Sequence, residues 1–357
     1  MSETNSAMTS TDITTEASST RSSTSSTEVG SMGTGKKIIA VVGATGQQGG
    51  GLARAILGDP QGPFALRVLT RRTDSAAARE LAARGADVVH ADLDDEASML
   101  RAFEGAYGAF VVTNFWAERT PEEEAARTRP QMELDQAGVA ARAAKAAGLK
   151  HVIWSTLEDT RPHFEHLGSE LPTLLDRYKV PHFDAKGEAD NLFTSLGVPT
   201  TFLLTTMFYE AFLVGQGPRR DEDGRLALTN PMGDSALAVV AAEDIGRTAY
   251  GIFRAGARYV GRTVGLAGDH LTGVQLAETF TRVLGERVEY RPLTHDQMRS
   301  AGFPGADEIG NMYQFYAEAA DYFVGVRDID LVRRELHPDL VSFEDWLTVH
   351  KDQIPLG

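Results

Sequence analysis

A short apolar stretch that ends in glycines and continues directly into a helical pattern constrains the fold of this chain most. The run from Ile38 to Val42 predicts a buried β-strand, and the residues after Gly49 predict a helix. Gly43, Gly46 and Gly49 have the spacing G-x-x-G-x-x-G. In this setting Gly43 allows a sharp turn, Gly46 lets a pyrophosphate approach the backbone, and Gly49 lets the helix pack against the strand. The stretch predicts a dinucleotide-binding unit; the alternative is a tight turn in an α/β protein that binds no nucleotide.

The rest of the chain alternates between strand and helix patterns. Apolar runs typical of strands lie at residues 64–72, 86–93, 109–114, 151–156 and 198–206. This alternation predicts an α/β fold with a Rossmann-type, doubly wound parallel sheet. Between the fifth and sixth strands, residues 157–180 are expected to form a polar loop before the next helix. Beyond residue 206 the elements become shorter, which predicts a smaller C-terminal α/β cap. We expect a disordered Ser/Thr-rich leader at 1–35, an NAD(P)-binding Rossmann domain at 36–206, and a substrate- or partner-binding cap at 207–357 whose chain can cross back to the Rossmann domain.

Composition narrows the class of protein. The 357 residues carry a formal net charge of −15 and include no cysteine. The acidic balance argues against a basic surface for nucleic-acid phosphates, and the missing thiols exclude disulfides and thiolate zinc sites. No apolar run approaches the roughly 20 residues of a membrane span, and the leader lacks the apolar core of a secretory signal. We therefore expect a cytoplasmic protein that binds neither nucleic acid nor membrane directly, and we predict no metal site.

The end of the second predicted strand bears on the choice of dinucleotide. An NAD-specific fold places an acidic residue there to bind the ribose 2′-hydroxyl, whereas this chain has Arg71 and Arg72. A guanidinium can bind a 2′-phosphate through two hydrogen bonds, so NADP(H) is expected over NAD(H). The alternative is two solvated surface arginines. Asp92 and Leu93 follow the third strand, where such folds hold the adenine, although Asp92 can equally cap the next helix.

The helix after the fifth predicted strand carries the candidates for catalysis. A short-chain dehydrogenase uses a tyrosine as proton donor and a lysine four residues later. Here His182 stands at the tyrosine position and Lys186 at the lysine position. We expect Lys186 to bind the nicotinamide ribose; the alternatives are a surface lysine or a partner for Asp190 or Glu188. His182 is either a proton donor or a histidine at the helix entry without chemistry, so no catalytic residue is assigned firmly.

These motifs together resemble the NmrA-like branch of the atypical short-chain dehydrogenase/reductase superfamily. The resemblance is closest to its HSCARG (NmrA-like family domain-containing) proteins. It covers about residues 37–351 and is carried by the segments 43–50, 69–71, 112–116, 182–188, 197–199 and 302–306, with Asn311-Met312-Tyr313 following. It implies a protein that binds NADP(H) with little or no turnover and changes its protein partners with the redox state of the dinucleotide. A basic contact of the family falls at Arg127 or Arg129, or is absent.

The resemblance and the motifs define one set of expected contacts. The residues expected to bind the dinucleotide are Gly43, Thr45, Gly46, Gln47, Gln48, Gly49, Arg71, Arg72, Asp92, Leu93, Thr113, Asn114, Phe115, Lys186, Met207, Phe208, Tyr209 and Glu210. The function expected first is an NADP(H)-binding redox sensor. The alternative is an NAD(P)H-dependent reductase of quinones or other carbonyl acceptors, with water or His182 as proton source. A regulatory protein partner, a small-molecule acceptor and a homodimer all remain open.

Overall fold

A seven-stranded parallel sheet forms the centre of the computed structural model, which describes residues 35–357. The leader prediction therefore lies almost wholly outside the described residues. The strand order is β11-β6-β5-β4-β1-β2-β3, and every pairing is parallel. The bounds of these strands are β1 (Lys37–Val42), β2 (Phe64–Thr70), β3 (Asp87–His90), β4 (Gly108–Val111), β5 (His151–Thr156), β6 (Thr200–Leu204) and β11 (Thr263–Gly265). The predicted doubly wound α/β fold is confirmed.

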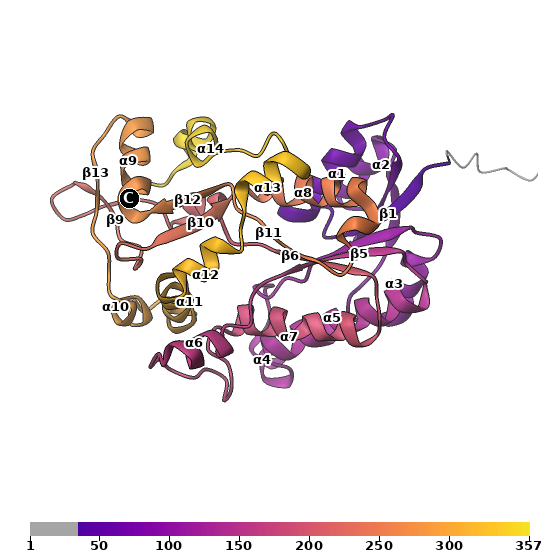
Figure 1. Cartoon of the computed structure of the whole chain (residues 1–357), viewed down its shortest axis with the longest axis horizontal. Helices are drawn as coiled ribbons and strands as arrows, with labels where there is room; N and C mark the ends of the chain where they lie inside the picture. Colours follow the sequence, from indigo (N-terminus) through magenta and orange to yellow (C-terminus); the bar gives the residue numbers. More distant parts are fainter. Residues whose placement is uncertain (1–34) are drawn as a thin grey trace, which may run out of the picture. The chain divides into compact units, whose positions relative to one another are not determined.

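Helices cover both faces of this sheet (Figure 1). One face carries α1 (Gln47–Gly58), α2 (Ala76–Ala83) and α8 (Ala242–Ala255). The other face carries α3 (Glu96–Phe103), α5 (Arg129–Ala146) and α7 (Pro181–Ser195). The strands β4 and β5 are buried throughout, as expected of parallel strands covered on both faces.

The chain after residue 206 returns to the large sheet. Strand β11 pairs with β6, and helix α8 packs against α1. The α1–α8 contact depends on glycine, because a Cβ at Gly51 would lie 2.5 Å from the carbonyl oxygen of Glu243, and one at Gly246 would meet the backbone of Leu52. Arg54 and Glu243 form an ion pair across the same contact. The two backbones therefore approach more closely than larger side chains would allow.

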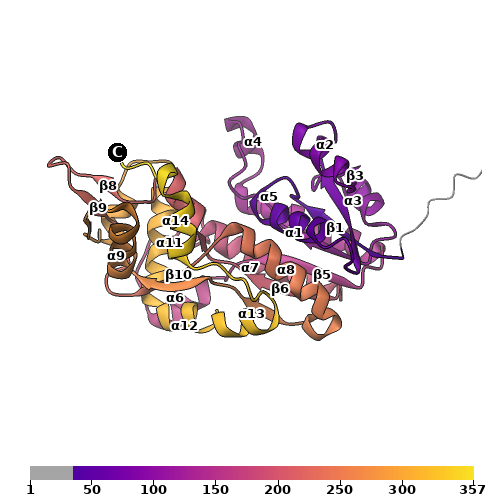
Figure 2. The same cartoon turned by 90° about the horizontal axis from the view of Figure 1, so that it is seen from above.

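The remaining C-terminal elements gather at one side of the large sheet (Figure 2). They include two three-stranded sheets, with the orders β12-β10-β7 and β13-β9-β8. Their strands are β7 (Met207–Phe208), β8 (Arg219–Arg220), β9 (Leu226–Leu228), β10 (Ala236–Val240), β12 (Asp269–Thr272) and β13 (Val288–Tyr290). Their helices are α9 (Gly273–Leu284), α10 (His295–Arg299), α11 (Ala306–Glu318), α12 (Ala320–Gly325) and α14 (Phe343–His350). Helix α13 (Ile329–Glu335) instead packs into the core of the large sheet through Val332. Fully buried aromatic rings, among them Tyr209, Phe212, Phe280 and Phe343, form much of the core here.

The structure corrects the sequence-based elements mainly where they are short. Residues 157–180 are not a continuous loop, because α6 (Arg161–Leu167) forms inside them and ends at Gly168, whose φ is 67°. Only Phe164 of this helix is buried, so its sequence shows no apolar periodicity. The strands β7, β8 and β12 were also not foreseen, since two to four residues cannot display a period. Within residues 35–357, no helix is long and apolar enough to cross a membrane.

Candidate functional site

The turn between β1 and α1 has the geometry expected of a phosphate-binding loop. Gly43 has a φ of +68°, and a Cβ at Gly49 would lie only 2.5 Å from the carbonyl oxygen of Gly43. Both positions therefore require glycine, for the reasons expected from the sequence. Helix α1 begins after Gly46 without a side-chain cap, so its first N–H groups have no capping side chain as a partner. Strands β1 and β4 are neighbours here, which places the turn where the strand order reverses.

A cavity of about 640 Å³, which we call the outer cavity, opens beside this turn. The ends of β1, β2 and β3 line it, together with the segment after β4. Of the predicted contacts, it includes Gly43, Thr45, Arg71, Arg72, Asp92, Leu93 and Asn114. Arg71 and Arg72 directly follow β2 and are exposed. Asp92 does not cap the next helix; Asp95 does, by accepting hydrogen bonds from the N–H groups of Ala97 and Ser98.

Arg127 and Arg129, the two candidates for an additional basic contact with the dinucleotide, have different surroundings in the structure. Arg127 lines the outer cavity and pairs with Asp94 at 2.9 Å and Asp135 at 3.6 Å. Arg129 instead donates to the backbone carbonyls of Phe115, at 2.6 Å, and Ala117, at 3.0 Å. Of the two, Arg127 therefore contributes to the cavity, and Arg129 fixes the segment that follows β4.

A second cavity of about 380 Å³, the inner cavity, lies next to the first, and Asn114 lines both. Of the predicted contacts, it includes Gln47, Gln48, Thr113, Asn114, Phe115, His182, Lys186, Met207, Phe208 and Glu210. Its remaining walls are largely apolar and include Trp116, Phe183, Met312 and Tyr316. Tyr209 lines neither cavity. Its ring packs against Phe343 and Trp346, and burial raises the pKa of its hydroxyl well above the usual value.

Lys186 belongs to a buried cluster at the edge of the inner cavity. Its Nζ donates to Thr113 Oγ1 at 2.6 Å and to Glu133 Oε1 at 2.5 Å. The Thr113 hydroxyl donates to the same Glu133 oxygen. Glu133 is fully buried, and its Oε2 has no hydrogen-bond partner. Glu133, rather than Asp190 or Glu188, is therefore the carboxylate in direct contact with Lys186.

His182, one helical turn before Lys186 on α7, forms a second buried pair at the inner cavity. Its Nδ1 lies 2.6 Å from Glu308 Oε1, and its backbone N–H donates to the same oxygen at 2.7 Å. A carboxylate at Nδ1 assigns the proton to that nitrogen and leaves Nε2 for other partners. The imidazole also lies near aromatic rings, with centroid distances of 5.9 Å to Phe115 and 5.2 Å to Trp116. His182 is thus held in one orientation by Glu308.

Ser155 connects the large sheet to the first turn of α1. Its hydroxyl donates to Gln48 Oε1 at 2.6 Å, and both residues line the inner cavity. The pair brings a strand-end hydroxyl and an amide next to Lys186, which also lines this wall. The inner cavity therefore combines a polar wall of Gln48, Thr113, Ser155 and Lys186 with an aromatic wall that holds His182.

The sequence profile of the NmrA-like family matches residues 35–347. The chain belongs to the NmrA-like family. The resemblance identified in the sequence is therefore confirmed. One relative is the NmrA-like family domain-containing oxidoreductase FrzB of a Cladobotryum species, which is 31% identical over 294 residues, covering 78% of this chain and 83% of the relative.

Solved structures share the fold of this NmrA-like chain. NmrA, a negative transcriptional regulator solved in complex with NADP, superposes with a TM-score of 0.67 at 24% identity, covering 88% of this chain and 95% of the regulator. The same regulator has also been solved with NAD. The NADPH-dependent quinone oxidoreductase QOR2 of Escherichia coli, complexed with NADPH, has a TM-score of 0.65 at 22% identity, covering 88% of this chain and 99% of the other. At these identities the likeness establishes the shared fold.

Sequence reasoning missed two carboxylates, Glu133 and Glu308, that hold Lys186 and His182 in the inner cavity of this NmrA-like chain. Glu133 falls on the buried face of α5, in line with Ala137, Ala140 and Ala144 at helical spacing. A carboxylate on an otherwise small and apolar helix face is a signal that could have revealed it. Glu308 offered no comparable signal, because 126 residues separate it from His182.

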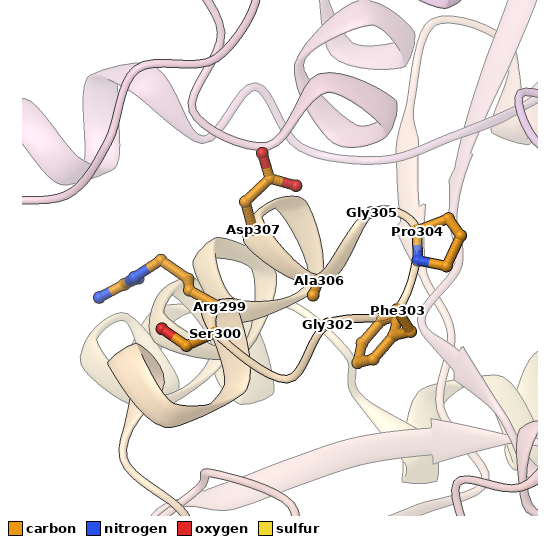
Figure 3. Close-up of a pocket in the computed structure, with 8 residues that line it drawn as sticks. All are labelled: Arg299, Ser300, Gly302, Phe303, Pro304, Gly305, Ala306 and Asp307. Carbon is orange, nitrogen blue, oxygen red and sulfur yellow. The ribbon is translucent and has the colours of Figure 1, made fainter.

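A third cavity, of about 470 Å³, lies between the end of α10 and the start of α11 (Figure 3). Figure 3 shows that the side chains of Arg299 and Asp307 point in different directions from each other. The loop between these two residues carries Phe303 and Pro304. The Arg299 guanidinium is already hydrogen-bonded to Asn311, Gln314 and Asp296. The polar groups do not converge on a common point, so this cavity offers no comparable chemistry. No cluster of three or more potential metal ligands occurs within residues 35–357.

Proposed function

We propose that this protein is an NADP(H)-dependent reductase of apolar carbonyl or quinone acceptors. The observation that carries the proposal is the His182–Glu308 pair beside the aromatic rings of the inner cavity, one helical turn before Lys186 on α7. An apolar cavity beside a dinucleotide site suits a flat, hydrophobic acceptor, and an oriented imidazole supplies a group that can transfer a proton. A protein that only bound the dinucleotide would need neither feature.

The residues present fit a dinucleotide that spans both cavities. The α1 N-terminus offers N–H groups without a side-chain cap for the pyrophosphate, and Gly43 and Gly49 keep the turn open to it. Arg71 and Arg72 line the outer cavity, and a guanidinium can bind a 2′-phosphate through two hydrogen bonds, which is the reason to propose NADP(H) over NAD(H). Further support comes from the shared fold of NmrA, solved with NADP and with NAD, and of QOR2, solved with NADPH.

The chemistry assigns separate tasks to the residues of the inner cavity. The bound NADPH supplies a hydride, and the reduction of a C=O group is completed by one proton. The imidazolium form of His182 gives up the proton on Nε2 and becomes neutral, keeps the Nδ1–H hydrogen bond to Glu308 throughout, and takes up a new proton from water before the next turnover. Lys186, held by Thr113 and Glu133, binds the sugar next to the nicotinamide. The aromatic wall excludes water and orients the acceptor by stacking.

Substitution of His182 tests the proposal. Steady NADPH oxidation is measured by absorbance against a panel of quinones and aromatic aldehydes, and the expected result is turnover with at least one acceptor. His182→Asn is expected to lower kcat by roughly 100-fold, the usual contribution of general acid catalysis, with the Kd for NADPH within about twofold of wild type. The matched control is His166→Asn, at an exposed position of α6, which should leave kcat unchanged. Turnover that persists at the wild-type rate in His182→Asn contradicts the assigned role.

A second candidate function is the redox-sensing regulator expected from the sequence. It is favoured by the histidine at the position of the usual tyrosine and by the engagement of Lys186 with Glu133. The same panel separates the two functions. Absence of turnover with every acceptor, together with a proteolysis pattern that differs between the NADP⁺- and NADPH-bound protein, would favour the regulator.

A further inference from the structure

We propose that Glu133 sets the relative affinity of the inner cavity for oxidised and reduced dinucleotide, because it neutralises Lys186 where the nicotinamide binds. The inference rests on the proposed function only in requiring that the nicotinamide ring enter the inner cavity. It assigns a positioning and electrostatic role to a residue that would not itself touch the acceptor.

The two redox forms respond differently to a nearby charge. The nicotinamide ring carries one positive charge in NADP⁺ and none in NADPH, whereas the rest of the molecule is identical. A net charge beside the ring therefore changes the affinity for NADP⁺ and leaves that for NADPH nearly unaffected. Lys186 and Thr113 both line the inner cavity, and Glu133 lies directly behind them. The ammonium and the carboxylate, 2.5 Å apart, present almost no net charge to the cavity.

The contacts of Glu133 are a poor arrangement for stability alone. Its side chain is wholly removed from solvent, and one of its oxygens has no partner among the described residues. Burying a charged pair costs desolvation energy that a single close contact often fails to recover. An apolar residue on α5 would fill the same space without this cost. The arrangement is explained by the charge that it removes from the cavity.

One other carboxylate near Lys186 has to be held constant. Asp190 lies one helical turn after Lys186 and accepts hydrogen bonds from Trp154 Nε1 at 2.9 Å and Thr156 Oγ1 at 2.7 Å. Burial raises the pKa of Asp190 to about 7. The two hydrogen bonds and the charge of Lys186 act in the opposite direction and lower it, but burial has the larger effect. The experiment is therefore run at pH 8.5, where Asp190 is largely ionised. The His182–Glu308 pair and Glu210 are further titratable groups at this cavity, and all three residues are left unchanged in every variant.

The test compares Glu133→Gln, Lys186→Met and the double variant. Calorimetry at pH 8.5 gives the Kd of NADP⁺ and of NADPH for each protein. Glu133→Gln removes one negative charge beside Lys186 while Asp190 stays ionised, so the ratio Kd(NADP⁺)/Kd(NADPH) should rise by roughly tenfold. Lys186→Met leaves the negative charge of Glu133, so the ratio should fall by about the same factor. The double variant removes both charges and should return the ratio to within about threefold of wild type.

Opposite signs in the single variants distinguish an electrostatic role from a structural one. Loss of packing, or of a sugar contact from Lys186, weakens both redox forms equally and cancels in the ratio. The matched control is Glu165→Gln on exposed α6, which should not change the ratio. An unchanged ratio in Lys186→Met, or in Glu133→Gln if it folds, overturns the inference even if the enzyme reduces acceptors. Ratios that shift as expected uphold it even if no acceptor is reduced, and a wild-type protein that binds neither dinucleotide overturns both proposals.

Discussion

The outer and inner cavities lie side by side at the same edge of the sheet but are built in different ways. The outer cavity is lined largely by short segments that directly follow strands, together with Arg127 and the first turns of α5, and Arg71 and Arg72 are exposed. The polar groups of the inner cavity are held by buried pairs that are distant in the sequence. Lys186 is 53 residues from Glu133, and His182 is 126 residues from Glu308. Substitutions in the outer cavity should therefore alter binding alone, whereas those in the inner cavity should also alter stability and its dependence on pH.

A substitution in the glycine turn between β1 and α1, which borders both cavities, should have the largest effect on dinucleotide binding. Gly49→Ala places a Cβ against the backbone of Gly43 and Val42, so the turn must shift. The Kd values of NADPH and NADH should both rise by roughly 100-fold or more, because the phosphate-binding N–H groups move with the turn. Calorimetry of both dinucleotides measures the effect.

A position in the same helix provides the control for Gly49→Ala. A Cβ at Gly58, at the end of α1, would meet no atom within 4 Å. Gly58→Ala should therefore bind both dinucleotides as the wild-type protein does. Normal binding by Gly49→Ala would show that the close approach of helix and strand does not control the phosphate site.

The difference between the two cavities, one formed mostly by contiguous motifs and the other by contacts distant in the sequence, explains how much of the site could be predicted from the sequence. The glycine turn and the arginines after β2 could be recognised because each motif is contiguous and its chemistry is local. Strands β1 and β5 were predicted to within a residue, since each has an apolar run at its centre that is rich in β-branched residues. Neither Glu133 nor Glu308 could be connected to its partner, because a contact between distant helices leaves no periodic pattern. The Tyr209 side chain lies in a core instead of a cavity, which backbone proximity to the site could not reveal.

Stability should respond to pH through the buried wall of the inner cavity. The pKa of Asp190 is raised to about 7 by burial, from 3.8 in the unfolded chain. A carboxyl group whose folded-state pKa is raised has no effect on stability below pH 3.8, and it destabilises the folded state increasingly until pH passes about 7. Asp190→Asn removes this penalty and keeps an oxygen for Trp154 and Thr156. The free energy of unfolding of Asp190→Asn minus that of the wild-type protein should therefore increase between pH 4 and pH 8.5, by on the order of 2 kcal/mol.

Urea unfolding of the protein without dinucleotide, between pH 4 and 8.5, measures this difference. Asp339→Asn, at an exposed position between α13 and α14, makes the same chemical change outside both cavities. Its unfolding free energy should follow that of the wild-type protein across the range. If the unfolding free energy of Asp190→Asn also follows that of the wild-type protein at every pH, burial of Asp190 does not cause the expected pH dependence.

The smallest expected effect is confined to the outer cavity. Arg71→Ala removes the guanidinium that we propose binds the 2′-phosphate, so the Kd of NADPH should rise by roughly tenfold while that of NADH stays the same. Arg79→Ala, on the exposed face of α2, should leave both unchanged. Equal affinities of the wild-type protein for NADH and NADPH would contradict the role of Arg71. Because Arg71 is exposed, its contribution should shrink as salt is added, whereas the redox preference set by buried Glu133 should change much less.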